Sequence, residues 1–130
     1  MPSRRAIATL LSLFLYEDAK ASMLDFQTIK EAKQEYSNKE YSKAATSFQK
    51  VSKTPQGHYN FANSLYKDKK YKSALDEYKK VITTDKDLEF RKLHNMGNNY
   101  AQLQDLENSK KMYEKALTFK DDKETKENLE

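Results

Sequence analysis

The spacing between pairs of small residues constrains this chain more than any other feature of its sequence. Three helix-like stretches each have a small residue at their centre, and a second small residue follows twelve positions later. The pairs are Ala32 and Ala44, Ala62 and Ala74, and Gly97 and Ser109. Small side chains let two helix backbones approach closely, so a fixed separation between them is typical of a tight antiparallel helix hairpin. The sequence therefore predicts one hairpin used three times.

The second helix of each predicted hairpin carries a recurring apolar face. Residues 41–51, 71–81 and 106–116 align with one another. In each, an aromatic residue or leucine, a small residue, an aromatic residue and a small apolar residue stand three, four and three positions apart, which is one face of a helix. The repeats are offset by 30 and then 35 residues. The first junction is thus shorter by about one helical turn, which preserves the packing face.

Composition agrees with an all-α chain. Its 130 residues are enough for one domain, and they include two glycines, two prolines and no cysteine. A β-barrel or sandwich needs more turn residues. The lack of cysteine excludes a disulfide scaffold, a thiolate nucleophile, a zinc finger and an iron–sulfur site. We expect an all-α fold, a right-handed superhelical stack of antiparallel helix hairpins.

The charge of the chain is positive without the pattern of a nucleic-acid-binding surface. The sequence has 24 Lys and Arg against 20 Asp and Glu, a net charge of +4. Only Arg4, Arg5 and Arg91 are arginines, and the lysines alternate with acidic residues. Phosphate and base recognition use the arginine fork and patches of one sign. An RNA-binding helical repeat is therefore a minor alternative.

The N-terminal segment contains a strongly apolar run without a charged residue, from Ala6 to Tyr16. This run is about half as long as the 20 or so residues that span a membrane. Arg4 and Arg5 precede it, and Ala19-Lys20-Ala21 follows, so residues 1–21 resemble a secretory signal with a cleavage site. We interpret residues 1–21 as a signal-like or membrane-proximal apolar segment.

Two interpretations of this segment stay open. In the first, the protein is exported or attached to the inner membrane on its periplasmic side, with residues 1–21 cleaved or retained. The run is then a signal or the remainder of a longer membrane segment. In the second, residues 6–16 form an amphipathic helix that packs on the rest of a cytoplasmic domain.

The repeat pattern resembles the tetratricopeptide repeat (TPR), a helix–turn–helix unit of 34 residues. The resemblance covers about residues 25–120 and is clearest in the second repeat. Its signature positions there are Ala62, Tyr66, Tyr71, Ala74, Tyr78 and Val81. The resemblance implies a TPR domain over residues 22–130, with repeats at about 25–54, 55–89 and 90–120 and a partial final helix from about Asp121. Ser109 departs from the family pattern, which usually has alanine there.

A narrower resemblance concerns two short phrases. His94-Asn-Met-Gly-Asn98, its weaker copy Tyr59-Asn-Phe-Ala-Asn63 and the ending Asn128-Leu-Glu130 are similar to phrases in the TPR segment of bacterial aerotolerance (Bat)-type proteins. In that family the segment often follows a von Willebrand factor A domain and a membrane helix. The resemblance implies a bacterial envelope protein with a von Willebrand factor A domain protein as a partner, because this chain is too short to hold that domain.

The first helices of stacked hairpins line the concave side of a solenoid, so they supply the candidate groove. Polar residues form one stripe along each predicted first helix. The groove candidates are Lys30, Lys33, Asn60, Asn63, Arg91, His94, Asn95 and Asn98. An amide both donates and accepts, so the asparagines can clamp a peptide backbone, while Lys and Arg favour an acidic partner. In the alternative interpretation, the amides bond one another and only stabilise the stack.

The groove lacks part of a clamp known in TPR co-chaperones. In those relatives, lysines, arginine and asparagines hold a C-terminal Glu-Glu-Val-Asp tail through two carboxylates. Here Asn95 stands where such clamps have arginine, and Ile29 and Lys33 replace lysine and asparagine. We therefore do not predict recognition of that tail.

No catalytic, cofactor or metal site is expected. His58 and His94 are the only histidines, and no nucleophile–base spacing, HExxH, glycine-rich phosphate loop or calcium loop occurs. We expect a non-enzymatic adaptor or scaffold at the bacterial cell envelope that holds an extended, acidic partner segment in its concave groove. The alternative is a self-associating repeat protein, joined through residues 6–16 or through the ends of the solenoid.

Overall fold

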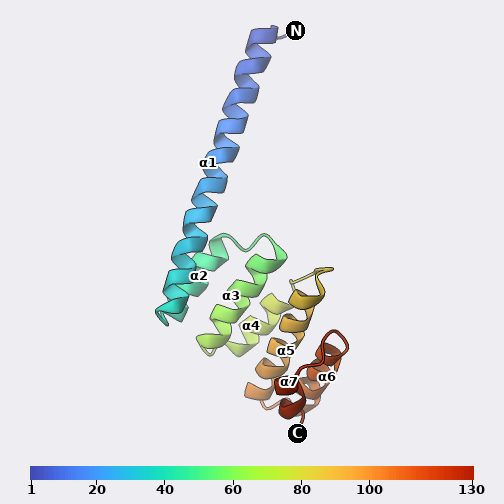
Figure 1. Cartoon of the computed structure of the whole chain (residues 1–130). Coiled ribbons are helices and arrows are strands. Elements are labelled where there is room, and N and C mark those ends of the chain that lie inside the picture. Colours follow the sequence, from blue (N-terminus) through green and yellow to red (C-terminus); the bar gives the residue numbers. More distant parts are fainter.

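The structure, a computed structural model, describes all 130 residues as seven α-helices without a strand. The helices are α1 (Arg4–Ser37), α2 (Tyr41–Lys50), α3 (Pro55–Lys67), α4 (Tyr71–Tyr78), α5 (Lys86–Gln102), α6 (Leu106–Leu117) and α7 (Lys123–Asn128). Successive helices pair as hairpins and stack into a solenoid, with α7 beside α5 and α6 at the C-terminal end (Figure 1). The predicted all-α fold class is confirmed.

The small-residue pairs lie where the helices of each hairpin meet. Ala32, Ala44, Ala62 and Ala74 are completely buried. In the third hairpin, the hydroxyl of Ser109 donates a hydrogen bond of 2.9 Å to the carbonyl oxygen of Gly97. Serine therefore replaces the usual alanine without leaving a buried polar group unpaired.

Each hairpin turns through one residue in the left-handed backbone region, and none of the three is glycine. These residues are Lys39, Lys69 and Gln104, with φ of 63°, 62° and 61°. In each turn, the amide of the following residue bonds to a carbonyl oxygen five positions earlier, which closes the helix end. The chain thus makes three equivalent turns without glycine, which agrees with its low glycine content.

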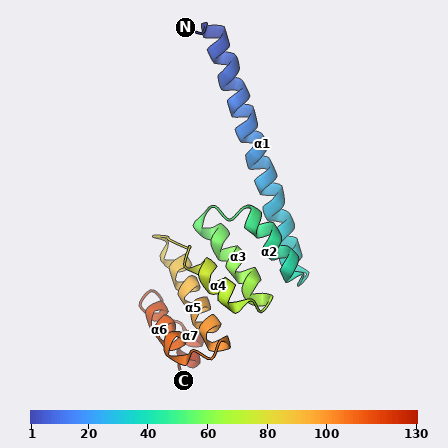
Figure 2. The same cartoon turned by 180° about the vertical axis from the view of Figure 1, so that it is seen from behind.

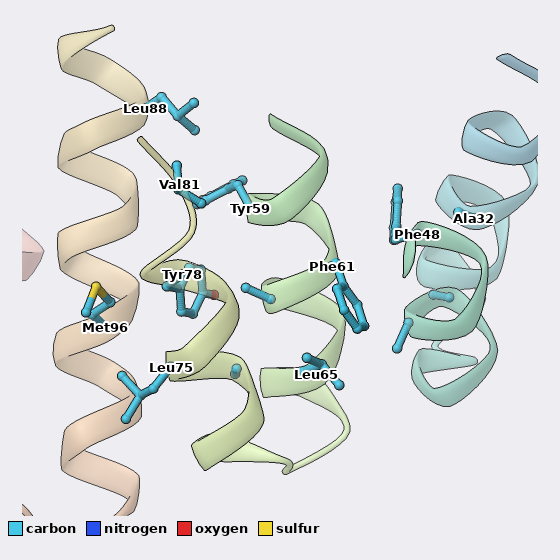
Figure 3. Close-up of a cluster of buried hydrophobic side chains, with 14 residues drawn as sticks. Ala32, Phe48, Tyr59, Phe61, Leu65, Leu75, Tyr78, Val81, Leu88 and Met96 are labelled. Atoms are coloured by element: carbon cyan, nitrogen blue, oxygen red, sulfur yellow. The ribbon is translucent and has the colours of Figure 1, made fainter. Parts of the chain in front are cut away.

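The main core runs between the hairpins. Its 14 residues come mostly from α2, α3 and α4, with Ala32 from α1 and Leu88 and Met96 from α5. Figure 3 shows Phe48 and Phe61 between the first two hairpins, and Tyr78 between α3 and α5. Tyr78 and Val81 are completely buried, so the second hairpin forms the centre of the stack.

Helix α1 extends far beyond the solenoid. It has 34 residues, of which only Ala32 is buried, and its N-terminal part projects away from the other helices (Figures 1 and 2). Residues 1–27 are all exposed. The alternative in which residues 6–16 pack on the domain is therefore wrong. The helix continues through position 21, and no helix of the structure is both long and apolar enough to cross a membrane.

Candidate functional site

A groove separates α1 from α3 on the face formed by the first helices. One part of it is a hollow of about 330 Å³ lined by Lys33, Tyr36, Ser37, Phe48, Asn60 and Asn63. A second hollow of about 310 Å³ shares Lys33, Phe48 and Asn60 with the first and extends it along α3 to Gln56. We call the two hollows together the α1–α3 groove. Three of the predicted site residues, Lys33, Asn60 and Asn63, meet here.

The groove is open because the first repeat lacks a bond that the other two repeats make. In each repeat, one residue of the first helix and one of the second are separated by fifteen positions. These pairs are Lys33 and Phe48, Asn63 and Tyr78, and Asn98 and Tyr113. In the second and third pairs, the tyrosine hydroxyl donates a hydrogen bond to the asparagine Oδ1. In the first pair there is neither hydroxyl nor amide, and both side chains line the hollow.

Two lysines, Lys33 and Lys53, line this groove, and neither forms an ion pair in the structure. The lining of the first hollow, to which Lys33 belongs, contains no carboxylate, whereas Asp25 lines the second hollow. Phe48 supplies an apolar wall of the first hollow. A cation beside an apolar surface can bind a ligand that carries both an acidic group and a hydrophobic group.

Asn60 adds an amide to the groove. Its Oδ1 accepts a hydrogen bond of 2.8 Å from Nε2 of Gln56, one turn earlier on α3. No intramolecular bond engages the NH₂ group of Asn60. That group is therefore free to donate to a carbonyl oxygen of a bound chain.

Asn63 is held by a network that extends to α5. Its Oδ1 accepts from the Tyr78 hydroxyl and, at 3.0 Å, from Nδ2 of Asn95. Asn95 also donates to the Tyr59 hydroxyl at 3.1 Å. Burial raises the pKa of Tyr78 above its ordinary value, so this hydroxyl stays protonated and remains a donor. The network leaves the NH₂ group of Asn63 as the part that can bind a ligand.

Two of the predicted site residues on α5 already have partners in the stack. Asn95 connects α5 to α3 through the network of Asn63. Arg91 lies 5.1 Å from the ring centroid of Tyr59 and pairs through Nε with Asp87 at 3.0 Å. The interpretation in which the amides bond one another therefore describes the contact between Asn63 and Asn95. The ammonium group of Lys33 and the NH₂ group of Asn60 have no partner within the chain.

The remaining predicted site residues lie elsewhere. Lys30 lines a different hollow, of about 480 Å³, with Glu35 and Lys43 on the other side of α1. Nδ1 of His94 is 2.7 Å from the hydroxyl of Thr125 in α7. The Asn98 amide oxygen accepts from Tyr113, and neither His94 nor Asn98 lines the α1–α3 groove.

The predicted site residues do not include the two aromatic residues that line the first hollow, Tyr36 and Phe48. Aromatic residues at helical spacing usually pack inside, and Phe48, which is 4% exposed, is indeed also part of the main core. Comparison of the three fifteen-residue pairs could have identified Phe48, because it is the only one of the three aromatic residues without a hydroxyl.

Comparisons with known proteins agree with this architecture. A tetratricopeptide repeat family model matches residues 93–123. No curated protein sequence matches significantly. Neither the family match nor the structures below bear on the Bat-type resemblance.

Two solved structures are similar over most of this chain. One is described as the TPR2AB-domain:pHSP90-complex of yeast Sti1, with a TM-score of 0.73, 19% identity and 83% of this chain covered. This chain spans only 45% of that one. The other is the first TPR of Spaghetti (RPAP3) bound to the HSP90 peptide SRMEEVD, with a TM-score of 0.71 and 19% identity. That match covers 81% of this chain and 86% of the other. At this identity, the similarity shows a shared fold.

Proposed function

We propose that this chain is a protein-interaction module of the tetratricopeptide repeat type. A tetratricopeptide repeat family model matches residues 93–123, and solved TPR structures share the fold of the chain. Its α1–α3 groove binds an extended, acidic segment of a partner protein. The observation that carries this proposal is the unpaired Lys33 beside Phe48, at the position where the other two repeats close the gap with a tyrosine–asparagine bond.

The chemistry of the groove favours a peptide with an acidic side chain. Lys33 provides the positive charge of the first hollow, and Lys53 and Asp25 add one charge of each sign in the second. The free NH₂ groups of Asn60 and Asn63 donate to backbone carbonyl oxygens of the bound segment. Amide contacts to the backbone do not distinguish side chains, so selectivity comes from Lys33 and from the apolar wall at Phe48.

The similar solved structures support this type of partner. One is described as a pHSP90 complex and the other as bound to the HSP90 peptide SRMEEVD, which contains two Glu and ends in Asp. The present groove has Lys33 free, whereas Arg91 is engaged with Asp87 and Tyr59. We therefore propose recognition of an acidic segment centred on Lys33, and not the two-carboxylate clamp of the co-chaperones.

The proposed place of action is the bacterial cell envelope, with the protein exported or attached to the inner membrane. The support is the N-terminal part of α1, where Arg4 and Arg5 precede an exposed apolar run. Its exposed large side chains include Ile7, Leu10, Leu11, Leu13, Phe14, Leu15 and Tyr16. A helix segment that is apolar on all sides normally lies in a core or a membrane. A von Willebrand factor A domain protein is the proposed partner class there.

Binding of labelled peptides to the full chain tests the groove. Three fluorescent peptides of equal length are compared by anisotropy: one rich in Asp and Glu, one neutral and one rich in Lys. The acidic peptide should bind most tightly. Lys33→Glu should raise its Kd about tenfold. The matched control is Lys30→Glu, one turn earlier on the same helix but in a different hollow, which should change Kd less than about twofold.

Two results would contradict the groove proposal. The first is an equal loss of affinity in Lys33→Glu and Lys30→Glu, which would indicate general attraction to a basic protein. The second is a lack of preference for the acidic peptide, with circular dichroism showing that the variants are folded.

Self-association is a second candidate function, favoured by the exposed apolar run of residues 6–16. In this case the run of one copy occupies the α1–α3 groove of another. Light scattering of the full chain should then show an average mass that rises with concentration and falls in the variant Leu11→Glu/Phe14→Glu. A monomer at all concentrations would eliminate this candidate.

A further inference from the structure

A second hollowed surface lies between α4 and α6, where α5 turns a different face outward. Two adjoining hollows of about 390 and 510 Å³ share Lys79, Glu89, Lys92 and Phe119. We call them together the α4–α6 surface. None of the residues assigned above to peptide binding lines it.

The charge of the α4–α6 surface is positive and largely uncompensated. Glu89 is its only carboxylate, and it pairs with Lys92 at 2.8 Å in a half-buried contact. Lys92 also donates to the carbonyl oxygen of Val81 at 3.1 Å, so its charge has partners within the chain. Lys79, Lys86 and Lys115 also line the hollows and form no ion pair.

Large apolar side chains are exposed among these lysines. Ile82 is 82% exposed in the loop between α4 and α5, and Phe119 is 43% exposed after the end of α6. Met112 and Leu93 line the same hollow as Phe119. Three lysines without ion pairs therefore line these hollows together with two exposed hydrophobic side chains, a combination suited to an acidic ligand with a hydrophobic anchor.

We propose that the α4–α6 surface is a second binding site, whose ligand is an acidic protein segment with a large apolar side chain. The apolar side chain enters the hollow beside Phe119 and Met112, and the acidic groups on either side of it approach Lys79, Lys86 and Lys115. This proposal is independent of the α1–α3 groove, because the two sites share no residue. With both sites occupied, the module joins two acidic segments at once.

Charge complementarity selects this ligand over the alternatives. Lysines without arginine give no bidentate contact to phosphate, which disfavours a nucleic acid. Ile82 and Phe119 would contribute nothing to a ligand that is only charged. A short peptide that carries both acidic groups and a large apolar side chain can contact the three lysines as well as Ile82 and Phe119.

The test uses two synthetic peptides and the isotope-labelled full chain. The peptides are acetylated Glu-Glu-Phe-Glu-Glu amide and its counterpart with Ala in place of Phe. Titration followed by NMR should shift the amide signals of Ile82 and Phe119 with the Phe peptide, and the Ala peptide should bind at least about fivefold more weakly.

Matched variants separate this site from general attraction and from the groove. Lys79→Glu/Lys115→Glu should weaken binding of the Phe peptide at this surface about tenfold, and Lys72→Glu, an exposed lysine of α4 outside both hollows, less than about twofold. Lys33→Glu should leave the shifts of Ile82 and Phe119 unchanged. All variants concern exposed side chains, and their circular dichroism spectra check folding.

Any of three results would overturn the proposal. One is a set of shifts confined to the α1–α3 groove. Another is equal weakening by Lys72→Glu and by the double variant. The third is tighter binding at this surface to an RNA oligonucleotide or to vesicles containing phosphatidylglycerol than to the Phe peptide. A failure of the groove experiment leaves these readouts unaffected, because they report on different residues.

Discussion

Phe48 and Lys33 line one hollow at the positions where the next repeat joins Tyr78 to Asn63 by a hydrogen bond. The same backbone arrangement thus gives a closed contact in one repeat and an open groove in another. The difference lies in two side chains, which makes the groove accessible to a direct test.

Closing the groove should be possible by copying the second repeat into the first. In the double variant Lys33→Asn/Phe48→Tyr, the new hydroxyl donates to the new amide oxygen. We expect a coupling free energy of about 1 kcal/mol between the two changes, measured by urea unfolding of the double and both single variants. Binding of the acidic peptide should be lost. A coupling near zero would show that the two side chains do not meet.

Asn63→Ala should destabilise the fold through the inter-repeat network. The change leaves the buried Tyr78 hydroxyl without its acceptor and removes a partner of Asn95, so we expect a loss of about 1–3 kcal/mol in the free energy of unfolding. Asn60→Ala is the matched control, because Asn60 only accepts from the exposed Gln56. Its effect should stay below about 0.5 kcal/mol. Equal effects in urea unfolding would refute the structural role of Asn63.

Gly97→Ala should destabilise the third hairpin. In an open helix this change would stabilise by about 1 kcal/mol, because alanine has the higher helix propensity. Here a Cβ atom would lie 2.5 Å from the ring of Tyr113, which is itself 4% exposed and cannot move freely. We expect a net loss of about 1–3 kcal/mol in thermal unfolding. In the background Tyr113→Leu the penalty should shrink, and an unchanged penalty would place the clash elsewhere.

Alkaline pH should destabilise the stack. Burial is the main cause that raises the pKa of Tyr36, Tyr66, Tyr78 and Tyr113 above the ordinary value of 10.0. Because the folded pKa values exceed the unfolded ones, the stability contributed by these neutral hydroxyls is complete below pH 10 and is lost as pH rises beyond it. Urea unfolding at increasing pH measures this loss.

The control for alkaline unfolding is Tyr78→Phe. This variant removes the most strongly shifted hydroxyl, so its stability should fall less steeply above pH 10, although it starts lower because the bond to Asn63 is missing. A slope identical to that of the unchanged chain would contradict the assignment.

Contacts within a repeat could be predicted from the sequence, whereas contacts between repeats were left as alternatives, among them the amide contact that Asn63 makes with Asn95. Ala32, Ala62 and Gly97 identified the hairpins because close backbone approach depends only on small side chains at a fixed spacing. Asp85 and Asp122 cap the N-termini of α5 and α7, positions at which aspartate is strongly preferred. These are local properties of the chain.

His94 illustrates why the rest of the site could not be predicted. It occupies the position of Tyr59 in the preceding repeat, and both side chains reach the first helix that follows their own hairpin. For His94 that helix is the short α7, whose place depends on how the last hairpin stacks. Helical spacing predicts which face of its helix a residue lies on. Whether that face borders a groove or packs against another helix depends on how the neighbouring hairpins stack.

Because α1 is one continuous helix, it fixes both the distance between its apolar run and the α1–α3 groove and their relative rotation about the helix axis. Each helical residue contributes a rise of about 1.5 Å and a rotation of about 100°. Nine positions separate Tyr16 from Asp25, the groove residue of α1 that is nearest to the run. The continuous helix thus holds the exposed run and the groove about 14 Å apart and at a fixed rotation about the helix axis. One residue inserted between them would turn the groove by more than a quarter of a revolution relative to whatever holds the run.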